Sequence, residues 1–124
     1  IQYVNLHGTG TRLNDEIEAR VMHTIFENPP PCSSTKPLTG HCLGASGALE
    51  AGVCWLALSK AADYNNRIPL PPHWWDGEAD ESFPELSLTQ TGQSLPAQGD
   101  ICMMSSSFAF GGNNVALVMG CDFG

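Results

Sequence analysis

Three short segments place histidine or lysine beside glycine, threonine or asparagine, residue types that could act together on a carbonyl group. The segments are His7-Gly8-Thr9-Gly10-Thr11, Lys36-Pro37-Leu38-Thr39-Gly40-His41 and Phe108-Ala109-Phe110-Gly111-Gly112-Asn113-Asn114. Neutral imidazoles and free backbone amides both donate hydrogen bonds, and such donors stabilise an oxygen atom that gains negative charge. In a shared pocket, these segments would therefore suit chemistry at the carbonyl of a thioester or a similar group.

Each of the three segments follows a stretch that the sequence predicts to be a strand. Ile1–Leu6 is apolar and aromatic, Cys32–Thr35 is short, and Ile101–Met104 is expected to pair with Val115–Met119 as a hairpin with a Gly-Gly connection. In an α/β sheet, functional groups gather beyond the carboxyl ends of the strands. We therefore expect the three segments to converge on one site.

Two helices are predicted to position these strands. Asp15–Phe26 has apolar residues at helical spacing, with Asn14 as the expected N-cap. Residues 44–60 are also helical in pattern, but they are apolar almost all round, which is typical of a helix buried on most sides. The predicted strands and helices cannot cover such a helix. The sequence thus indicates an α/β layered fold that is part of something larger.

The remaining residues are expected to be less regular. Residues 63–66 are predicted to form a turn, residues 68–72 an extended segment, and Leu86–Leu88 an edge strand. His73 is expected in a loop with its ring stacked near Trp74, and His23 on the surface of the first helix.

Composition excludes several classes of protein. The 124 residues fit one domain, and a hydrophobic fraction of 42% supplies a core. Only 5 Lys and Arg oppose 13 Asp and Glu, so no basic face is available for nucleic acid or for an anionic membrane surface. The most apolar segment, residues 45–58, contains Glu50 and is too short to span a bilayer. The 5 cysteines include no CxxC pair, which indicates free thiols and favours a reducing cytoplasm.

Each chemical interpretation has a simpler structural alternative. His7 could be a strand-end histidine bound to a carbonyl, and Lys36 a solvated loop lysine. The glycine-rich turn could be a hairpin connection that needs positive φ at Gly111 and Gly112. The first segment lacks the full spacing of a phosphate loop. His7, His41 and a carboxylate could instead bind zinc. From the residues alone, these alternatives stay open.

Taken together, the segments resemble the β-ketoacyl-acyl carrier protein synthases, which are condensing enzymes with the thiolase fold. The order and separation of the matching residues agree over nearly the whole chain, and the match is weakest from Pro71 to Asp100. The matching residues are His7–Thr11 before Asp15 and Glu18, Ser33–Lys36 before Thr39–His41, and Ser107–Asn114. The resemblance implies that residues 1–124 form the C-terminal half of a thiolase-like fold, a mixed sheet packed by helices.

The resemblance also implies a reaction. In such enzymes a cysteine thiolate carries the acyl chain as a thioester, malonyl thioester loses carbon dioxide, and the resulting enolate attacks the acyl group in a Claisen condensation. His7 and His41 would hold the malonyl carbonyl and stabilise the enolate. Lys36 would support both histidines electrostatically, with Glu18 as the acidic partner that a buried lysine needs.

Other site residues follow from the same resemblance. The backbone N–H of Phe110 would contribute to an oxyanion hole, and its ring would gate the acyl pocket beside Phe108. The residues expected to contact substrate are Thr9, Thr11, Gly111 and Gly112. No cofactor and no metal are implied.

The nucleophilic cysteine is expected to lie outside this chain, in the N-terminal half of the enzyme. Cys32 is expected to belong to the short strand before Lys36, and Cys42 to the start of the helix after His41. The chain alone should therefore be inactive. The implied partners are an acyl carrier protein bearing acyl or malonyl phosphopantetheine, the N-terminal half of the same enzyme, and a second copy in a homodimer.

Several positions depart from the family pattern. Ala109 stands where glycine is usual, Asn113 replaces threonine, and Ser106 replaces asparagine. Residues 69–75 differ from those of housekeeping fatty-acid synthases, which leaves open a synthase for polyenes or polyketides. The alternative function is a non-catalytic partner subunit similar to chain-length factors, and the retention of histidines and lysine favours the enzyme. Carrier proteins are acidic, so the basic docking patch is expected in the absent half unless a few arginines suffice.

Overall fold

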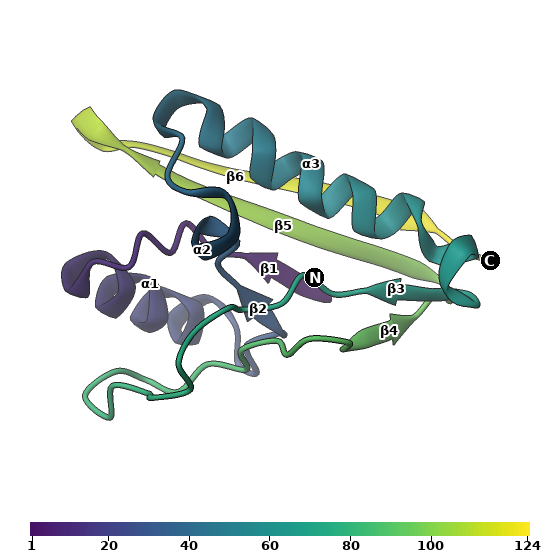
Figure 1. Ribbon diagram of the computed structural model, residues 1–124, viewed down its shortest axis with the longest axis horizontal. Helices are drawn as coiled ribbons and strands as arrows, with labels where there is room; N and C mark the ends of the chain where they lie inside the picture. Colours follow the sequence, from purple (N-terminus) through teal and green to yellow (C-terminus); the bar gives the residue numbers. More distant parts are fainter.

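The computed structural model describes residues 1–124 as a sheet with helices on both faces (Figure 1). The strands and helices are β1 (Tyr3–Asn5), α1 (Arg12–Ile25), β2 (Cys32–Ser33), α2 (Lys36–Thr39), α3 (Ser46–Ser59), β3 (Arg67–Pro69), β4 (Ser94–Pro96), β5 (Asp100–Ala109) and β6 (Asn113–Asp122). Short 3-10 turns, η1 (Leu43–Ala45), η2 (Ala61–Tyr64) and η3 (Phe110–Gly112), lie between them. No helix is long and apolar enough to cross a membrane.

The main sheet has the strand order β2-β1-β5-β6 and is mixed. The strand β1 is parallel to both β2 and β5, whereas β5 and β6 form an antiparallel hairpin in which Ile101 pairs with Cys121. A second, two-stranded sheet joins β3 to β4. The mixed sheet, its packing helices and the predicted hairpin are therefore confirmed.

Alternation along β1 divides the core between the two faces of the sheet, because successive strand residues point to opposite sides. Tyr3 packs with Met103 and with Cys54 of α3 in one apolar cluster. Val4 packs with Met22 of α1 in the other. The molecule is thus layered, with α3 running along β5 and β6 on one side and α1 on the other (Figure 1).

The helix α1 begins earlier than the sequence predicted. It starts at Arg12 with Thr11 as the N-cap residue, so the expectation of Asn14 as N-cap is wrong. The Asn14 side chain donates hydrogen bonds to Asp15 and Glu18 within the helix and therefore does not cap its first turn.

Two further expectations about local structure are wrong. Leu86–Leu88 is not a strand, since only an isolated bridge joins Leu88 to Cys32, and the partner of β3 is the unpredicted β4. The loop expected from Lys36 begins instead with one helical turn, α2, which has Pro37 in its first turn, where a missing backbone N–H costs nothing. All five cysteines are free, and of these Cys32 and Cys54 are buried.

Apolar side chains remain exposed on one helix, α3, and on one strand, β6. On α3, Trp55 is 61% exposed and Leu56 is 49% exposed, and on β6, Val115 and Val118 are more than half exposed. Soluble proteins rarely leave contiguous apolar surface uncovered unless another surface binds there. The nearly all-apolar helix predicted from the sequence is therefore present, and this chain covers only one side of it.

The loop after β1 passes very close to the end of β2 at Gly8 and Ser34. Gly8 has a φ of +41°, and a Cβ atom built on it would lie 2.4 Å from the Ser34 Cβ atom. Gly10, in the same loop, has a φ of +76° and nothing within 4 Å of such a Cβ atom. Only Gly8 therefore combines a left-handed backbone with a close approach.

Gly8→Ala should lower the free energy of unfolding of the intact protein. Backbone strain alone should cost about 1 to 3 kcal/mol, and the collision with Ser34 should add to that loss. Gly10→Ala, the matched control, carries the strain alone and should cost less. Denaturant unfolding of both variants measures the difference. Equal losses for the two substitutions would show that the approach to Ser34 is unimportant.

Candidate functional site

The structure brings two histidines, a lysine and a phenylalanine from different elements to one place. His7 follows β1, Lys36 begins α2, His41 lies between α2 and η1, and Phe108 lies in β5. The rings of His7 and His41 meet edge-on with centroids 5.7 Å apart, and those of His7 and Phe108 lie 5.6 Å apart. The loops at the carboxyl ends of β1, β2 and β5 thus meet as expected.

The ammonium group of Lys36 lies inside the protein and has a partner for each of its three protons. The residue is 6% exposed, and its Nζ donates to Glu50 Oε1, to the carbonyl oxygen of His7 and, at 3.5 Å, to His7 Nδ1. A lysine ammonium has three donors and no acceptor, so these contacts use all of them. The lysine is consequently fixed between α3 and the loop that carries His7.

The expectation that Glu18 is the acidic partner of Lys36 is wrong, because the carboxylate that pairs with Lys36 belongs to Glu50 of α3. Glu50 is 2% exposed and interrupts an otherwise apolar helix. A charge among apolar residues needs a partner. The single carboxylate in an apolar helix is the sequence signal that indicates Glu50 as the partner of a buried cation.

Glu18 instead holds the backbone of the loop after β1. Its carboxylate accepts hydrogen bonds from the N–H of His7 at 2.7 Å and from that of Gly8 at 2.8 Å, and Asn14 Nδ2 donates to it at 3.3 Å. Burial raises the pKa of Glu18, and these hydrogen bonds oppose that rise. Glu18 therefore positions His7 through the main chain.

Hydrogen bonds to the Nδ1 atoms fix which proton the two imidazoles carry when neutral. The N–H of Leu43 donates to His41 Nδ1 at 3.2 Å, and Ser46 Oγ lies 3.2 Å from the same atom. Lys36 Nζ approaches His7 Nδ1 in the same way. Since a backbone N–H and an ammonium can only donate, Nδ1 is the acceptor in both rings. Each neutral ring then carries its proton on Nε2, where it can donate to a ligand.

The surroundings of His7 keep it neutral. Burial is the largest cause that lowers the pKa of His7, followed by the positive charge of Lys36 and by His41, while Asp15 acts in the opposite direction. A neutral imidazole donates a hydrogen bond without giving up its proton. This property suits the stabilisation of an oxyanion better than general-acid chemistry.

The other predicted site residues lie at the rim. Phe110 is 92% exposed at the tip of the β5–β6 hairpin, where Gly111 and Gly112 both have a φ of 82°. Thr9 Oγ1 lies 2.9 Å from Thr11 Oγ1 on the loop after His7. The structure therefore places Phe108 against His7 and leaves Phe110 open to solvent.

Three buried oxygen atoms have no hydrogen-bond partner: Asn5 Oδ1, Glu50 Oε2 and Ser105 Oγ. Asn5 and Ser105 pair in register across β1 and β5. Buried polar atoms of this kind are normally satisfied by water or an ion, and these oxygens are the atoms in the site that could bind one. No group of three or more His, Cys, Asp or Glu side chains is arranged to hold a metal ion.

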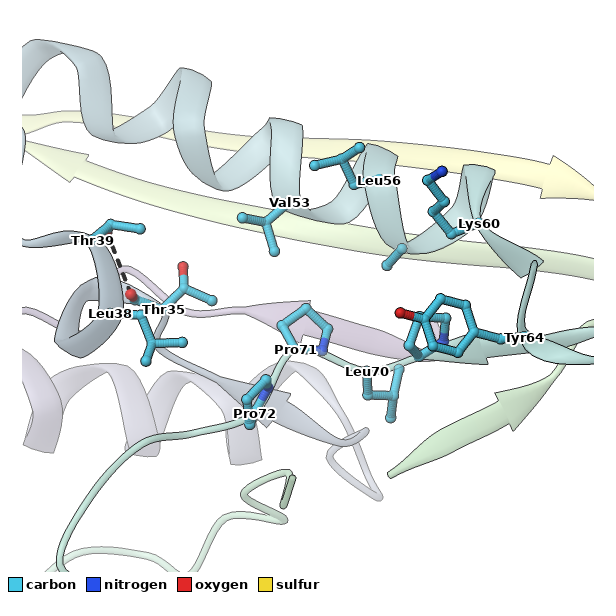
Figure 2. A pocket seen from close by; sticks show the side chains of 12 residues that line it. Thr35, Leu38, Thr39, Val53, Leu56, Lys60, Tyr64, Leu70, Pro71 and Pro72 are labelled. Atoms are coloured by element: carbon cyan, nitrogen blue, oxygen red, sulfur yellow. Dashed lines mark hydrogen bonds between the residues drawn. The ribbon is translucent and has the colours of Figure 1, made fainter. Parts of the chain in front are cut away.

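A groove of about 350 Å³ lies beside the site and does not include the histidines. Figure 2 shows it between α2, α3 and the extended segment after β3, with Leu38, Val53, Leu56 and Pro71 along its walls. Leu38 is 55% exposed and Leu56 is 49% exposed. The groove thus continues the open apolar face of α3.

Comparison with known proteins identifies relatives over nearly the whole chain. Residues 1–64 match the family described as beta-ketoacyl synthase, C-terminal domain. Nodulation protein E of Rhizobium leguminosarum bv. trifolii is 35% identical over 120 residues, which cover 94% of this chain and 27% of that protein. The mitochondrial 3-oxoacyl-[acyl-carrier-protein] synthase of Arabidopsis thaliana is 37% identical over 124 residues, covering 95% of this chain and 25% of that protein.

Solved structures share the fold. The ishigamide ketosynthase/chain length factor superposes with a TM-score of 0.79 at 30% sequence identity, over 97% of this chain and 28% of that one. Ketosynthase twelve of the bacillaene polyketide synthase in Bacillus amyloliquefaciens, at 21% identity, has the same fold with a TM-score of 0.77. The chain spans about a quarter of the length of the curated relatives it matches. By this match to more than half of its residues, the chain belongs to the beta-ketoacyl synthase family.

Proposed function

We propose that this chain is the C-terminal part of a decarboxylating 3-oxoacyl-[acyl carrier protein] synthase, which acts as a cytoplasmic homodimer in fatty-acid, polyene or polyketide synthesis. The observation that carries the proposal is the edge-on pair of His7 and His41, 5.7 Å apart, with both Nδ1 atoms accepting hydrogen bonds. Two Nε2–H donors are then free to bind one carbonyl oxygen.

The proposed reaction uses these donors while charge develops. As the malonyl thioester loses carbon dioxide, the C–C electron pair moves into an enolate, and its oxygen accepts hydrogen bonds from His7 and His41. The enolate carbon attacks the acyl thioester, forming a C–C bond while the C–S bond to cysteine breaks and the thiolate leaves. Neither histidine transfers a proton in these steps. Lys36 holds Nδ1 of His7, and its positive charge adds to burial in keeping that ring neutral.

The rim residues would serve the acyl and carrier sides of the reaction. The backbone N–H of Phe110 would donate to the oxygen of the tetrahedral intermediate, and its exposed ring beside Gly111 and Gly112 could gate the acyl pocket. The paired hydroxyls of Thr9 and Thr11 would bind the phosphopantetheine arm of the carrier.

The rest of a longer protein would complete the site. It would supply the nucleophilic cysteine and cover the apolar faces of α3 and β6, together with the groove in Figure 2. The length of the relatives, about four times that of this chain, supports this proposal. The basic docking patch for an acidic carrier protein would lie there too, since this chain has only 5 Lys and Arg.

A non-catalytic partner subunit is the alternative function, and one structural relative is a ketosynthase/chain length factor. The buried pair of Lys36 and Glu50 favours the enzyme. Burying two charges is seldom a gain in stability over apolar packing, so such a pair is better explained by a function that needs the ammonium.

Removing either imidazole should strongly slow decarboxylation of the malonyl thioester. In the full-length protein, His7→Ala or His41→Ala should slow that step by about 10² to 10³-fold, since each removes one oxyanion donor. Acyl transfer to the cysteine should be partly retained. Release of labelled carbon dioxide and acylation of the enzyme measure the two steps separately, with the exposed His23→Ala as control. Unchanged decarboxylation in both variants would contradict the enolate role.

The pair of Lys36 and Glu50 should contribute to stability and activity in separable ways. Lys36→Met leaves Glu50 buried without a partner and should cost about 3 to 5 kcal/mol of unfolding free energy. The double variant Lys36→Met/Glu50→Leu should regain most of that stability. It should remain poorly active, because His7 has lost its neighbouring ammonium. A stable and fully active double variant would make the pair purely structural.

A thiol-directed acyl analogue should label a cysteine outside residues 1–124. Burial raises the pKa of Cys32 to about 12, so this thiol stays protonated and unreactive. Mass spectrometry of the native protein should show a species larger than 13.3 kDa, with the label on a peptide absent from this chain. Labelling of Cys32 or Cys42, with loss of condensation, would place the nucleophile here and overturn the proposal.

A further inference from the structure

The backbone N–H of Ser34 leaves the strand ladder at the end of β2 and is accepted by a side chain. On the edge of β2 that faces away from β1, residues 87–89 pair with Cys32 through Cys32 N to Ser87 O at 2.9 Å and Thr89 N to Cys32 O at 3.0 Å. The next donor along this edge is Ser34 N–H, which His73 Nδ1 accepts at 3.1 Å. His73 thus takes the place of a strand residue.

Ser34 connects the two segments that carry His7 and Lys36. It is 3% exposed, and its Oγ donates to the carbonyl oxygen of Gly8 at 2.7 Å. The same Oγ accepts the backbone N–H of Lys36 at 3.3 Å. A displacement of Ser34 would therefore move the loop after β1 and the start of α2 together.

His73 is itself well held. Its backbone N–H donates to Thr89 O at 2.9 Å, and its ring packs edge-on against Trp75 with centroids 5.6 Å apart. The expected neighbour was Trp74, so that expectation is corrected to Trp75. Burial lowers the pKa of His73, with Asp15 opposing, which keeps the ring neutral and Nδ1 free to accept.

We propose that His73 is a positioning residue for the site of His7 and Lys36, acting through Ser34. Its role parallels that of Glu18, whose carboxylate accepts the N–H groups of His7 and Gly8 at the end of the neighbouring strand. Both side chains replace missing strand partners where the backbone turns into the site. The inference rests on the proposed function and adds a residue to which the condensing-enzyme resemblance assigned no role.

The test compares two amides that place an acceptor differently. In the full-length protein, His73→Asn puts Oδ1 near the position of Nδ1, whereas His73→Gln reaches the position of Nε2. His23→Gln is the control, because His23 is exposed and its Nε2 contacts Glu85 O rather than a residue of the site. For each variant, kcat and KM for malonyl carrier protein are measured per titrated active cysteine, and hydrogen exchange is measured on a peptide containing Ser34.

We expect His73→Asn to stay within about threefold of the unsubstituted enzyme in kcat. His73→Gln should lose about tenfold or more in kcat with little change in KM, since small displacements of positioned groups cost rate. Protection of the Ser34 amide should persist in the asparagine variant and fall in the glutamine variant. Equal kcat and equal exchange in both variants would overturn the proposal.

The two measurements separate this inference from the proposed function. If the unsubstituted protein performs no condensation, the proposed function fails. Exchange at Ser34 would then decide alone, because a difference between asparagine and glutamine supports the link from His73 to Ser34, and no difference refutes it. If both variants lose stability and kcat equally, His73 acts only as a structural residue and the inference is wrong.

Discussion

The arrangement of the site depends on one buried ammonium group. Lys36 Nζ donates to Glu50 of α3 and to both the carbonyl and the ring of His7, so it joins the helix layer to the loop after β1. An unpaired charge at this depth would strongly destabilise the fold. A lysine whose three protons are all bound has little freedom to move. The direction of the His7 ring and its tautomer follow from these contacts, and the positive charge of Lys36 adds to burial in keeping the ring neutral.

Side chains that accept backbone N–H groups do the remaining positioning. At the ends of β1 and β2 the chain turns away from its strand partners, and its amides need new acceptors. Glu18 accepts two of them and His73 accepts a third. A polar loop at a sheet edge is usually mobile, but these bonds extend the order of the sheet into the loop. His7 can then keep its position without lying in a strand itself.

The sequence predicted the elements better than their partners. The hairpin of β5 and β6 and the apolar helix α3 carry long or strongly patterned signals, so their existence could be predicted, and the short β1 lies within the apolar and aromatic run of residues 1–6. The strand β4 is three residues long and has no alternation to detect. Spacing also could not show which carboxylate meets Lys36, because Glu18 and Glu50 lie on different helices on opposite faces of the sheet. Only the isolation of Glu50 among apolar residues pointed to it.

The site is rigid on one side and open on the other. His7, Lys36 and Glu50 are buried, whereas His41 and Phe110 are exposed and the apolar face of α3 is uncovered nearby. Electrostatic stabilisation of an enolate is much weaker in water than in a dry site, because water competes for the same donors. For the proposed chemistry, this chain therefore supplies positioned donors, and the exclusion of water falls to the surface that covers His41 and Phe110. The cysteine would have to approach from that same open side, since the opposite side is filled by Lys36 and its partners.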